Sequence, residues 1–247
     1  MKATALEFRL RMAIMTAVIT LGFWAPWIEA WGIGRRISLL EWLALQISRL
    51  GLATFNLATP AIIVFASLVA AIGAVFRVWG TAWIGHETMR HAQMQAGAVQ
   101  AGGPYRHVRN PLYLGSWCMF AAMAFLMPAS GAVFAMVLLT VLLYRLILGE
   151  EEFLAARLGE PYQEYRRAVP RLIPRLHAGL PPTAAKPRWI VAALSELNPI
   201  GVFLILACLS WSYDYWLMVK AIVVSLGVSL VVRAFLPRGQ QDPTLPA

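Results

Sequence analysis

Three basic side chains stand directly before an apolar run in the stretch GGPYRHVRNPLYLG: Arg106, His107 and Arg109. Asn110 and Pro111 predict that a helix begins there, because asparagine is a favoured N-cap and proline suits the first helical turn. Helix N-termini and guanidinium groups both attract anions, so the stretch predicts an anion-binding site, with the preceding glycines allowing close backbone approach. Taken alone, the same stretch is also explained as a basic anchor at a membrane surface.

Acidic residues follow a later apolar run. Glu150 and Glu151 come directly after it, and Arg145 lies just inside it. Ionisable residues at that depth in a membrane segment are usually functional, although glutamate is also common in the first turn of a solvated helix. An apolar face follows, which either lies on the bilayer or caps a pocket: Phe153, Leu154, Leu158, Tyr162 and Tyr165.

The two charged clusters are separated by two apolar segments with only PASG between them. A tight helical hairpin is therefore expected, and it returns the chain to the side from which it started. This brings the cations of residues 106–109 near the carboxylates of residues 150–151. A site with both charges suits a zwitterionic ligand.

The composition places these clusters in a membrane protein. Of the 247 residues, 60% are hydrophobic and 13% charged, with a mean hydropathy of +0.65, whereas soluble domains carry roughly 25% charged residues. The net charge of +9 fits basic residues beside membrane segments better than nucleic-acid binding. We therefore expect an all-α, polytopic transmembrane bundle with a cytosolic cofactor pocket.

About six apolar segments approach the roughly 20 residues that a helix needs to cross a bilayer. They are residues 12–31, 57–79, 112–127, 133–148, 189–209 and 215–235. The first is expected to be a retained span, since no cleavable signal pattern is visible. RRISLLEWLALQISRL, between the first two, predicts an amphipathic helix on the outer surface.

Lys and Arg residues predict the orientation of these spans. With a cytosolic N-terminus and six spans, 17 of the 21 Lys and Arg residues fall on the cytosolic side or beside it, as the positive-inside rule requires. We expect an integral protein of a bacterial inner membrane with both termini in the cytosol. The expected division is a core at 1–176, a Pro-rich linker at 177–188 and a two-span tail at 189–247.

Several common motifs are absent or incomplete. GIGRR has no third glycine and no βαβ context, so it does not predict a dinucleotide site. HETMRH spaces its histidines five apart, which is not a zinc-protease spacing. Cys118 and Cys208 each lie in an apolar run. We predict neither a metal site nor a disulfide.

The two charged clusters resemble the integral-membrane methyltransferases of the isoprenylcysteine carboxyl methyltransferase and phospholipid N-methyltransferase group. The motif G-P-Y-x-x-x-R-[HN]-P-x-Y-x-G is followed by a helical hairpin and then by E-E-x-x-L-x-x-x-[FL]-G-x-x-Y-x-x-Y, in the same order and spacing. The similar stretch covers roughly residues 75–175. The resemblance implies S-adenosylmethionine as methyl donor, and a membrane lipid, a lipid-tailed molecule or a small hydrophobic molecule as acceptor.

The resemblance also implies roles for single residues. Arg109 matches an arginine near the reacting groups, and we assign catalysis to it and to Glu151. Arg145 is similar to an arginine that faces the substrate. Asn110 stands where many relatives carry histidine, so a histidine contact is lost. The expected cofactor-binding residues are Val99, Gln100, Tyr105, Arg106, His107, Asn110, Pro111, Tyr113 and Glu150.

Two other functions remain open from the sequence. Membrane sterol and steroid reductases have a similar region and bind NADPH, although they usually lack the paired motifs. A transporter or scaffold with a broken-helix site at SELNPIG is the other alternative; the plainer interpretation of that stretch is a polar helix entry at the interface. The acceptor atom (carboxylate, amine or thiol) and the oligomeric state are not predicted.

Overall fold

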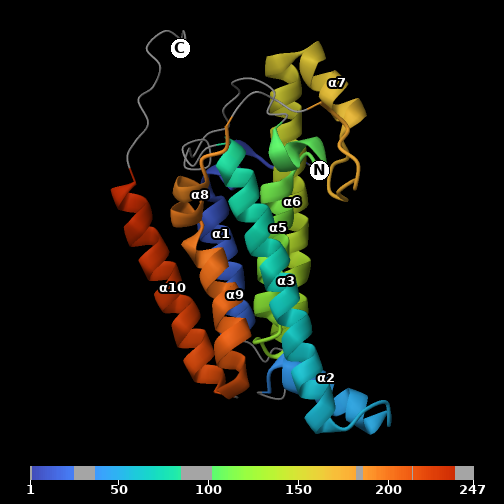
Figure 1. The fold of residues 1–247 in the computed structure, drawn as a ribbon, viewed down its shortest axis with the longest axis vertical. Helices are drawn as coiled ribbons and strands as arrows, with labels where there is room; N and C mark the ends of the chain where they lie inside the picture. Colours follow the sequence, from blue (N-terminus) through green and yellow to red (C-terminus); the bar gives the residue numbers. More distant parts are fainter. Residues whose placement is uncertain (1, 25–36, 85–101, 182–185, 213, 237–247) are drawn as a thin grey trace.

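The described part of the chain is a bundle of α-helices (Figure 1), as its composition predicted. The computed structural model describes residues 2–24, 37–84, 102–181, 186–212 and 214–236. The helices are α1 Ala5–Trp24, α2 Leu39–Arg49, α3 Phe55–Ile84, α5 Pro111–Ala124, α6 Ala129–Leu158, α7 Glu160–Ala168, α8 Trp189–Ser195, α9 Leu197–Leu209 and α10 Tyr215–Phe235, with short 3₁₀ turns η2 Gly103–Arg106 and η3 Ser210–Ser212.

Within the described residues, three helices are long and apolar enough to cross a bilayer, namely α3, α6 and α10. A fourth span results if α8 and α9 count as one segment bent by 69°. The expected hairpin is present, but α5 has only 14 residues. The first helix, α1, carries Glu7, Arg9 and Arg11 near its start. α1 packs along α6, and α5 packs between α3 and α6.

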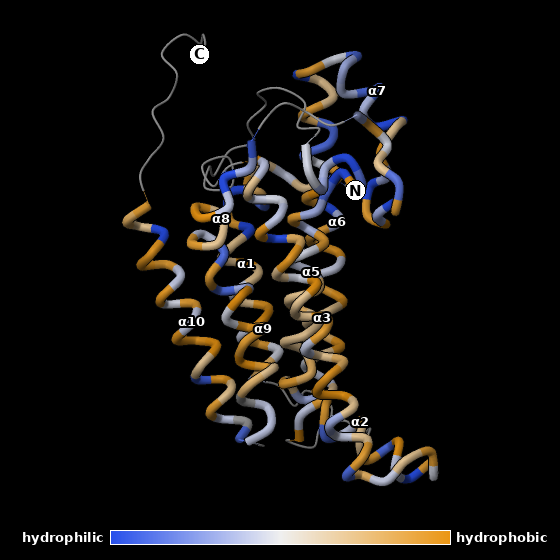
Figure 2. The backbone as a smooth tube through the Cα atoms, in the orientation of Figure 1, coloured by the Kyte–Doolittle hydropathy of each residue, from blue (hydrophilic) through white to orange (hydrophobic). Residues whose placement is uncertain are grey.

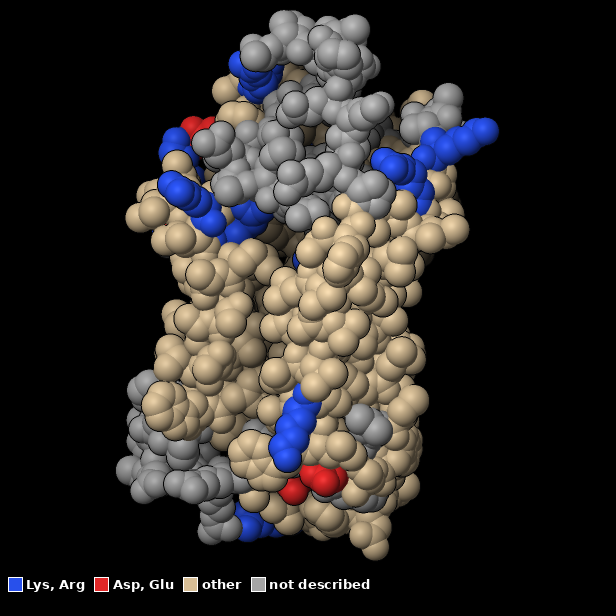
Figure 3. All heavy atoms as spheres, turned by 90° about the vertical axis from the view of Figure 1, so that its left-hand side faces the viewer, with Lys and Arg blue, Asp and Glu red and all other residues tan. Residues whose placement is uncertain are grey.

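The outer faces of the long helices are apolar. Figure 2 shows hydrophobic residues along α3, α6 and α10, and hydrophilic residues gathered at the end where α7 lies. On the face drawn in Figure 3, Lys and Arg cluster toward the same end above a largely uncharged belt. Exposed apolar patches of this size mark contact with a partner or a membrane. They fit an integral membrane protein, with the polar end carrying α7 and η2.

Two glycines bring α5 against α3. A Cβ atom on Gly73 would lie 2.9 Å from the carbonyl oxygen of Gly115, and one on Gly115 would lie 2.8 Å from the carbonyl oxygen of Gly73. Small residues allow such close contact between membrane helices. The contact fixes the start of α5, where the basic cluster lies, relative to α3.

A second glycine pair joins α1 to α6. A Cβ atom on Gly131 would overlap the carbonyl group of Gly22. Replacing Gly131 by valine should therefore lower the free energy of unfolding by about 1–3 kcal/mol, as overpacking does. Denaturant unfolding in detergent micelles measures this change. Gly227→Val in α10 is the control, because a Cβ there meets no atom within 4 Å; equal losses in both variants would contradict the close contact.

The expected fifth span, residues 189–209, is not one straight helix. It breaks between α8 and α9 at Glu196, whose side chain is fully buried. Pro199 explains the break, because a proline ring clashes with the carbonyl group four residues earlier, here that of Ser195. The break places a carboxylate inside the bundle.

The predicted amphipathic helix is α2. Ser38 and Glu41 form a reciprocal capping box at its N-terminus. The backbone N–H of Leu39 donates to the carbonyl oxygen of Met127, so α2 is attached to the turn between α5 and α6. It lies at the opposite end of the bundle from α7 (Figure 1).

Candidate active site

A strap of residues 169–180 runs beside the basic cluster. The backbone N–H of Arg109 donates to the carbonyl oxygen of Pro170 (2.8 Å), and that of Gly179 donates to the carbonyl oxygen of Arg106 (2.8 Å). Between them, the N–H of Arg175 donates to the carbonyl oxygen of His107 (3.0 Å). The strap therefore fixes residues 106–109 over the start of α5.

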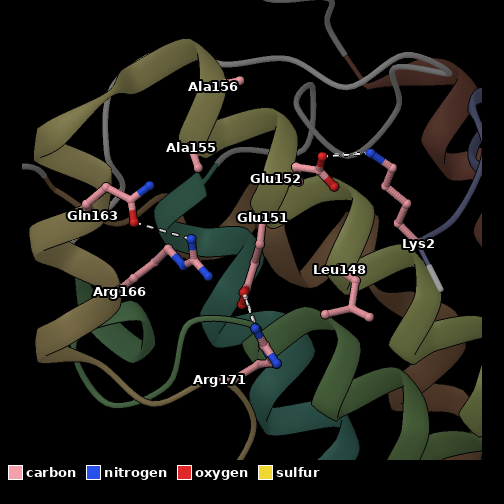
Figure 4. Close-up of a pocket in the computed structure, with 9 residues that line it drawn as sticks. All are labelled: Lys2, Leu148, Glu151, Glu152, Ala155, Ala156, Gln163, Arg166 and Arg171. Atoms are coloured by element: carbon pink, nitrogen blue, oxygen red, sulfur yellow. Dashed lines mark hydrogen bonds and ion pairs between the residues drawn. The ribbon is translucent and has the colours of Figure 1, made fainter.

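Glu151 is the centre of the site. Its carboxylate oxygen Oε1 accepts a hydrogen bond from Asn110 Nδ2 (3.0 Å) and lies 3.2 Å from Arg109 Nε. Its other oxygen, Oε2, is bound by Arg171 through Nε (3.0 Å) and Nη2 (2.9 Å), an ion pair visible in Figure 4. Glu151 is only 3% exposed. The predicted meeting of the two charged clusters occurs at this carboxylate.

Asn110 stands immediately before α5, which begins at Pro111 as predicted. Its side chain does not cap that helix, contrary to the expectation. Instead its amide donates to Glu151 and to the carbonyl oxygen of Arg171 (3.2 Å). Hydrogen bonds to an ionised carboxylate are charge-assisted and stronger than bonds between neutral groups. This favours the side-chain orientation in which the Asn110 amide donates to Glu151. Asn110 thus links α5, α6 and the strap.

The three consecutive glutamates of α6 have different surroundings. Successive helical side chains point about 100° apart, so Glu150 faces Tyr113 and Arg11, between α5 and α1, while Glu151 faces the strap. Glu152 is exposed and pairs with Lys2 at 2.7 Å.

Two of the predicted anion-binding side chains hold the strap. Arg106 Nε donates to the carbonyl oxygen of Leu180 (2.7 Å), and His107 Nδ1 lies 2.8 Å from that of Arg175. Arg109 Nη1 likewise donates to the carbonyl oxygen of Arg166 (2.8 Å). Of the three, Arg109 reaches the carboxylate centre.

Arg145 lies on the face of α6 that meets α1. Its Nη2 atom is 3.0 Å and 2.8 Å from the two carboxylate oxygens of Glu7. The backbone N–H of Ala3 donates to its carbonyl oxygen. This places Arg145 between α1 and α6, about 1.7 helical turns from Glu151. Val99 and Gln100, also predicted to bind the cofactor, lie outside the described residues.

Tyr105 is buried beneath α7. Its carbonyl oxygen accepts a hydrogen bond from the Tyr165 hydroxyl (2.9 Å). Its own hydroxyl has no partner among the described residues, and burial raises the pKa of Tyr105 well above its ordinary value. The predicted apolar face packs inward, because four of its members form a cluster with Val169 and Leu180 of the strap: Leu154, Leu158, Tyr162 and Tyr165.

An open pocket of ≈ 670 Å³ lies between α6, α7 and the N-terminal residues (Figure 4). Its charged lining residues are Lys2, Glu151, Glu152, Arg166 and Arg171. The pocket thus offers both cations and carboxylates. Within the described residues, no group of three His, Cys, Asp or Glu residues is arranged to hold a metal.

Sequence reasoning missed several of these residues. In the sequence Arg171 is one of many basic residues, and its contact with Glu151 depends on the path of the strap. Glu7, the partner of Arg145, carries a signal in the sequence, because a lone acid at the start of an apolar helix indicates such a pair.

Comparisons with known proteins point to the same part of the chain. Residues 61–160 match the family model described as phospholipid methyltransferase. This range includes most of α3, the start of α5 and the glutamates of α6, but neither the strap nor α8–α10. No solved structure matches the chain.

One relative is methanethiol S-methyltransferase from Crocosphaera subtropica. It is 41% identical over 70 residues, which cover 28% of this chain and 27% of the relative. The match therefore spans about a quarter of either protein. Together with the family match, it confirms that the chain resembles the integral-membrane methyltransferases of the isoprenylcysteine carboxyl and phospholipid group.

Proposed function

We propose that the chain is an integral-membrane methyltransferase that uses S-adenosylmethionine at its cytosolic end. The observation that carries this proposal is the buried Glu151 carboxylate, held by Arg109, Asn110 and Arg171 beside an open pocket. Buried charged clusters at the edge of a cleft are typical of functional sites. The family match over residues 61–160 supports the same activity.

The residues present fit this methyl donor. S-adenosylmethionine carries a carboxylate, an amino group and a sulfonium whose methyl group is electrophilic. Arg166, Arg171 and Lys2 line the pocket as partners for a carboxylate, and Glu152 as a partner for an amino group. The orphaned hydroxyl of Tyr105 is a further polar atom without a partner among the described residues.

The chain itself contributes alignment and dryness. Positioning of the reactants can lower an activation barrier by roughly 7–11 kcal/mol. Arg109 is proposed to lie near the reacting groups, oriented by Glu151, while Tyr113 and Tyr105 offer aromatic faces to a cation. Arg145, paired with Glu7 between α1 and α6, is proposed to meet the acceptor as it arrives from the bilayer.

The acceptor is proposed to be a small or lipid-tailed carboxylate, amine or thiol. The relative named for methanethiol makes a thiol the first class to test. Membranes containing the protein are incubated with methyl-labelled S-adenosylmethionine, and the label is followed into lipid, protein and volatile fractions. Label in none of them, when a thiol, an amine and a carboxylate acceptor have each been added, would refute the proposal. Binding of NADPH instead would favour a reductase.

Glu150 provides a direct test of the cofactor site. Glu150→Ala should abolish transfer while the protein stays folded, because the resemblance assigns this carboxylate, which lies beside Tyr113, to the methyl donor. Glu160→Ala is the control, since Glu160 is exposed on the surface of α7, where it pairs with Arg167. Full activity in Glu150→Ala would remove this residue from the site.

A further inference from the structure

The break between α8 and α9 places a carboxylate against the core. Glu196 is fully buried, and its backbone N–H donates to the carbonyl oxygens of Ala192 and Ala193 at the end of α8. The family match does not account for it, since that match ends at residue 160.

Glu196 binds Arg77 of α3 in a two-pronged pair. Arg77 Nε lies 2.7 Å from Oε2 and Arg77 Nη2 lies 2.8 Å from Oε1. Thr81 donates its hydroxyl to Oε1 (2.8 Å), and Arg233 of α10 lies 3.7 Å from Oε2. Bidentate Arg–carboxylate pairs fix geometry as well as charge. The pair therefore sets the direction of the Arg77 side chain.

Arg77 in turn contacts the start of α5. Its Nη1 atom donates to the Ser116 hydroxyl (2.8 Å), which donates to the carbonyl oxygen of Leu112 (2.9 Å). A Cβ atom on Gly115 would lie 2.8 Å from Arg77 Cγ. Arg77 therefore supports the first two turns of the helix that begins with Pro111.

Tyr105 belongs to η2, which packs against the end of α3, where a Cβ on Gly103 would overlap the Trp83 ring. Burial is the main cause that raises the pKa of this tyrosine. The hydroxyl of Tyr105 is one of the buried atoms without a hydrogen-bond partner among the described residues. The Arg77–Glu196 pair lies between the C-terminal helices and the polar end of the core.

We propose that Glu196 is a positioning residue, which orients Arg77 so that η2 and the start of α5 hold their site-forming arrangement. The C-terminal helices then complete the site instead of standing apart from it. This inference rests on the proposed function, because the arrangement it concerns is that of the methyl-donor site.

The test compares the whole chain in detergent micelles with two variants of the Arg77–Glu196 pair. Glu196→Gln keeps the shape and removes the charge, whereas Arg77→Lys keeps the charge and removes the bidentate geometry. Binding of S-adenosylhomocysteine is measured by calorimetry, and hydrogen exchange is followed over residues 103–116. Each variant should weaken binding at least tenfold and speed exchange there, and Glu196→Asp should restore part of the affinity.

The controls separate the possible outcomes. Asp214→Asn removes the other described carboxylate of the C-terminal helices, an exposed cap of α10, and should change neither readout. Wild-type protein that does not bind S-adenosylhomocysteine would refute the proposed function itself. If the wild type binds and the folded Arg77→Lys and Glu196→Gln variants bind equally well, the positioning role is wrong. If Glu196→Gln does not fold, Arg77→Lys decides the question alone.

Discussion

Glu151→Gln is expected to lose about 3–5 kcal/mol of unfolding free energy, the usual cost of removing one partner from a buried ion cluster. The variant leaves Arg109 and Arg171 facing each other without their carboxylate, and Arg109 is only 9% exposed. Glutamine keeps the volume of the glutamate side chain, so the lost unfolding free energy measures the effect of removing the negative charge. Methyl transfer should fall with it, because Arg109 loses the group that orients it.

Unfolding by denaturant in detergent micelles measures the first effect, and label transfer measures the second. Glu160→Gln is the control, with an exposed carboxylate on α7 that is 64% accessible and pairs with Arg167. Exposed pairs contribute little to stability, so this variant should behave as wild type. Equal stabilities for the two variants would mean that Glu151 is not the centre of a buried cluster.

Arg109→Ala is expected to lower the rate of methyl transfer about 100-fold or more, the usual effect of removing a preorganised group at a reacting centre. The protein should remain folded, because Arg171 and Asn110 still bind Glu151 and the backbone of residue 109 still binds the strap. The expected signature is therefore a lost rate with a retained fold.

Initial rates at saturating methyl donor, together with a thermal unfolding curve, measure this prediction. Arg167→Ala is the matched arginine control, because Arg167 is 73% exposed and pairs with Glu160 on the surface of α7. It should leave both readouts unchanged. An Arg109→Ala variant with the wild-type rate would exclude Arg109 from the reacting centre.

Much of the site was predictable because it depends on local signals. Asn110 and Pro111 predict where α5 begins, and a short turn after it predicts that the chain returns to the same end. Together these place Arg109 near residues 150–151 without knowledge of any other contact. The all-α membrane bundle is predicted by composition, since too few charged residues are present to cover a soluble surface.

The identity of the buried glutamate was not predictable in the same way. Three glutamates follow one another, and the rotation of α6 about its own axis decides which one meets Arg109. That rotation is set by packing against α1 and α5, including the close contact between Gly22 and Gly131. Local sequence carries no information about it.

The break at Glu196 was partly predictable. Pro199 signals a helix interruption, whereas the apolar run of residues 189–209 predicts one continuous span. The partner of the carboxylate, Arg77, lies 119 positions earlier in the chain. A pair so distant forms only when α3 and the C-terminal helices pack side by side, so the sequence shows two charged residues and not their meeting.

The sequence by itself determined the class of protein, the presence of the hairpin and the start of α5, because apolar runs and helix starts are local properties. The tertiary structure decided which charges pair: Glu151 with Arg109 and Arg171, Arg145 with Glu7, and Glu196 with Arg77. The physical reason is that a charge in an apolar bundle must find its partner within about 4 Å, and only the packing of whole helices sets distances on that scale.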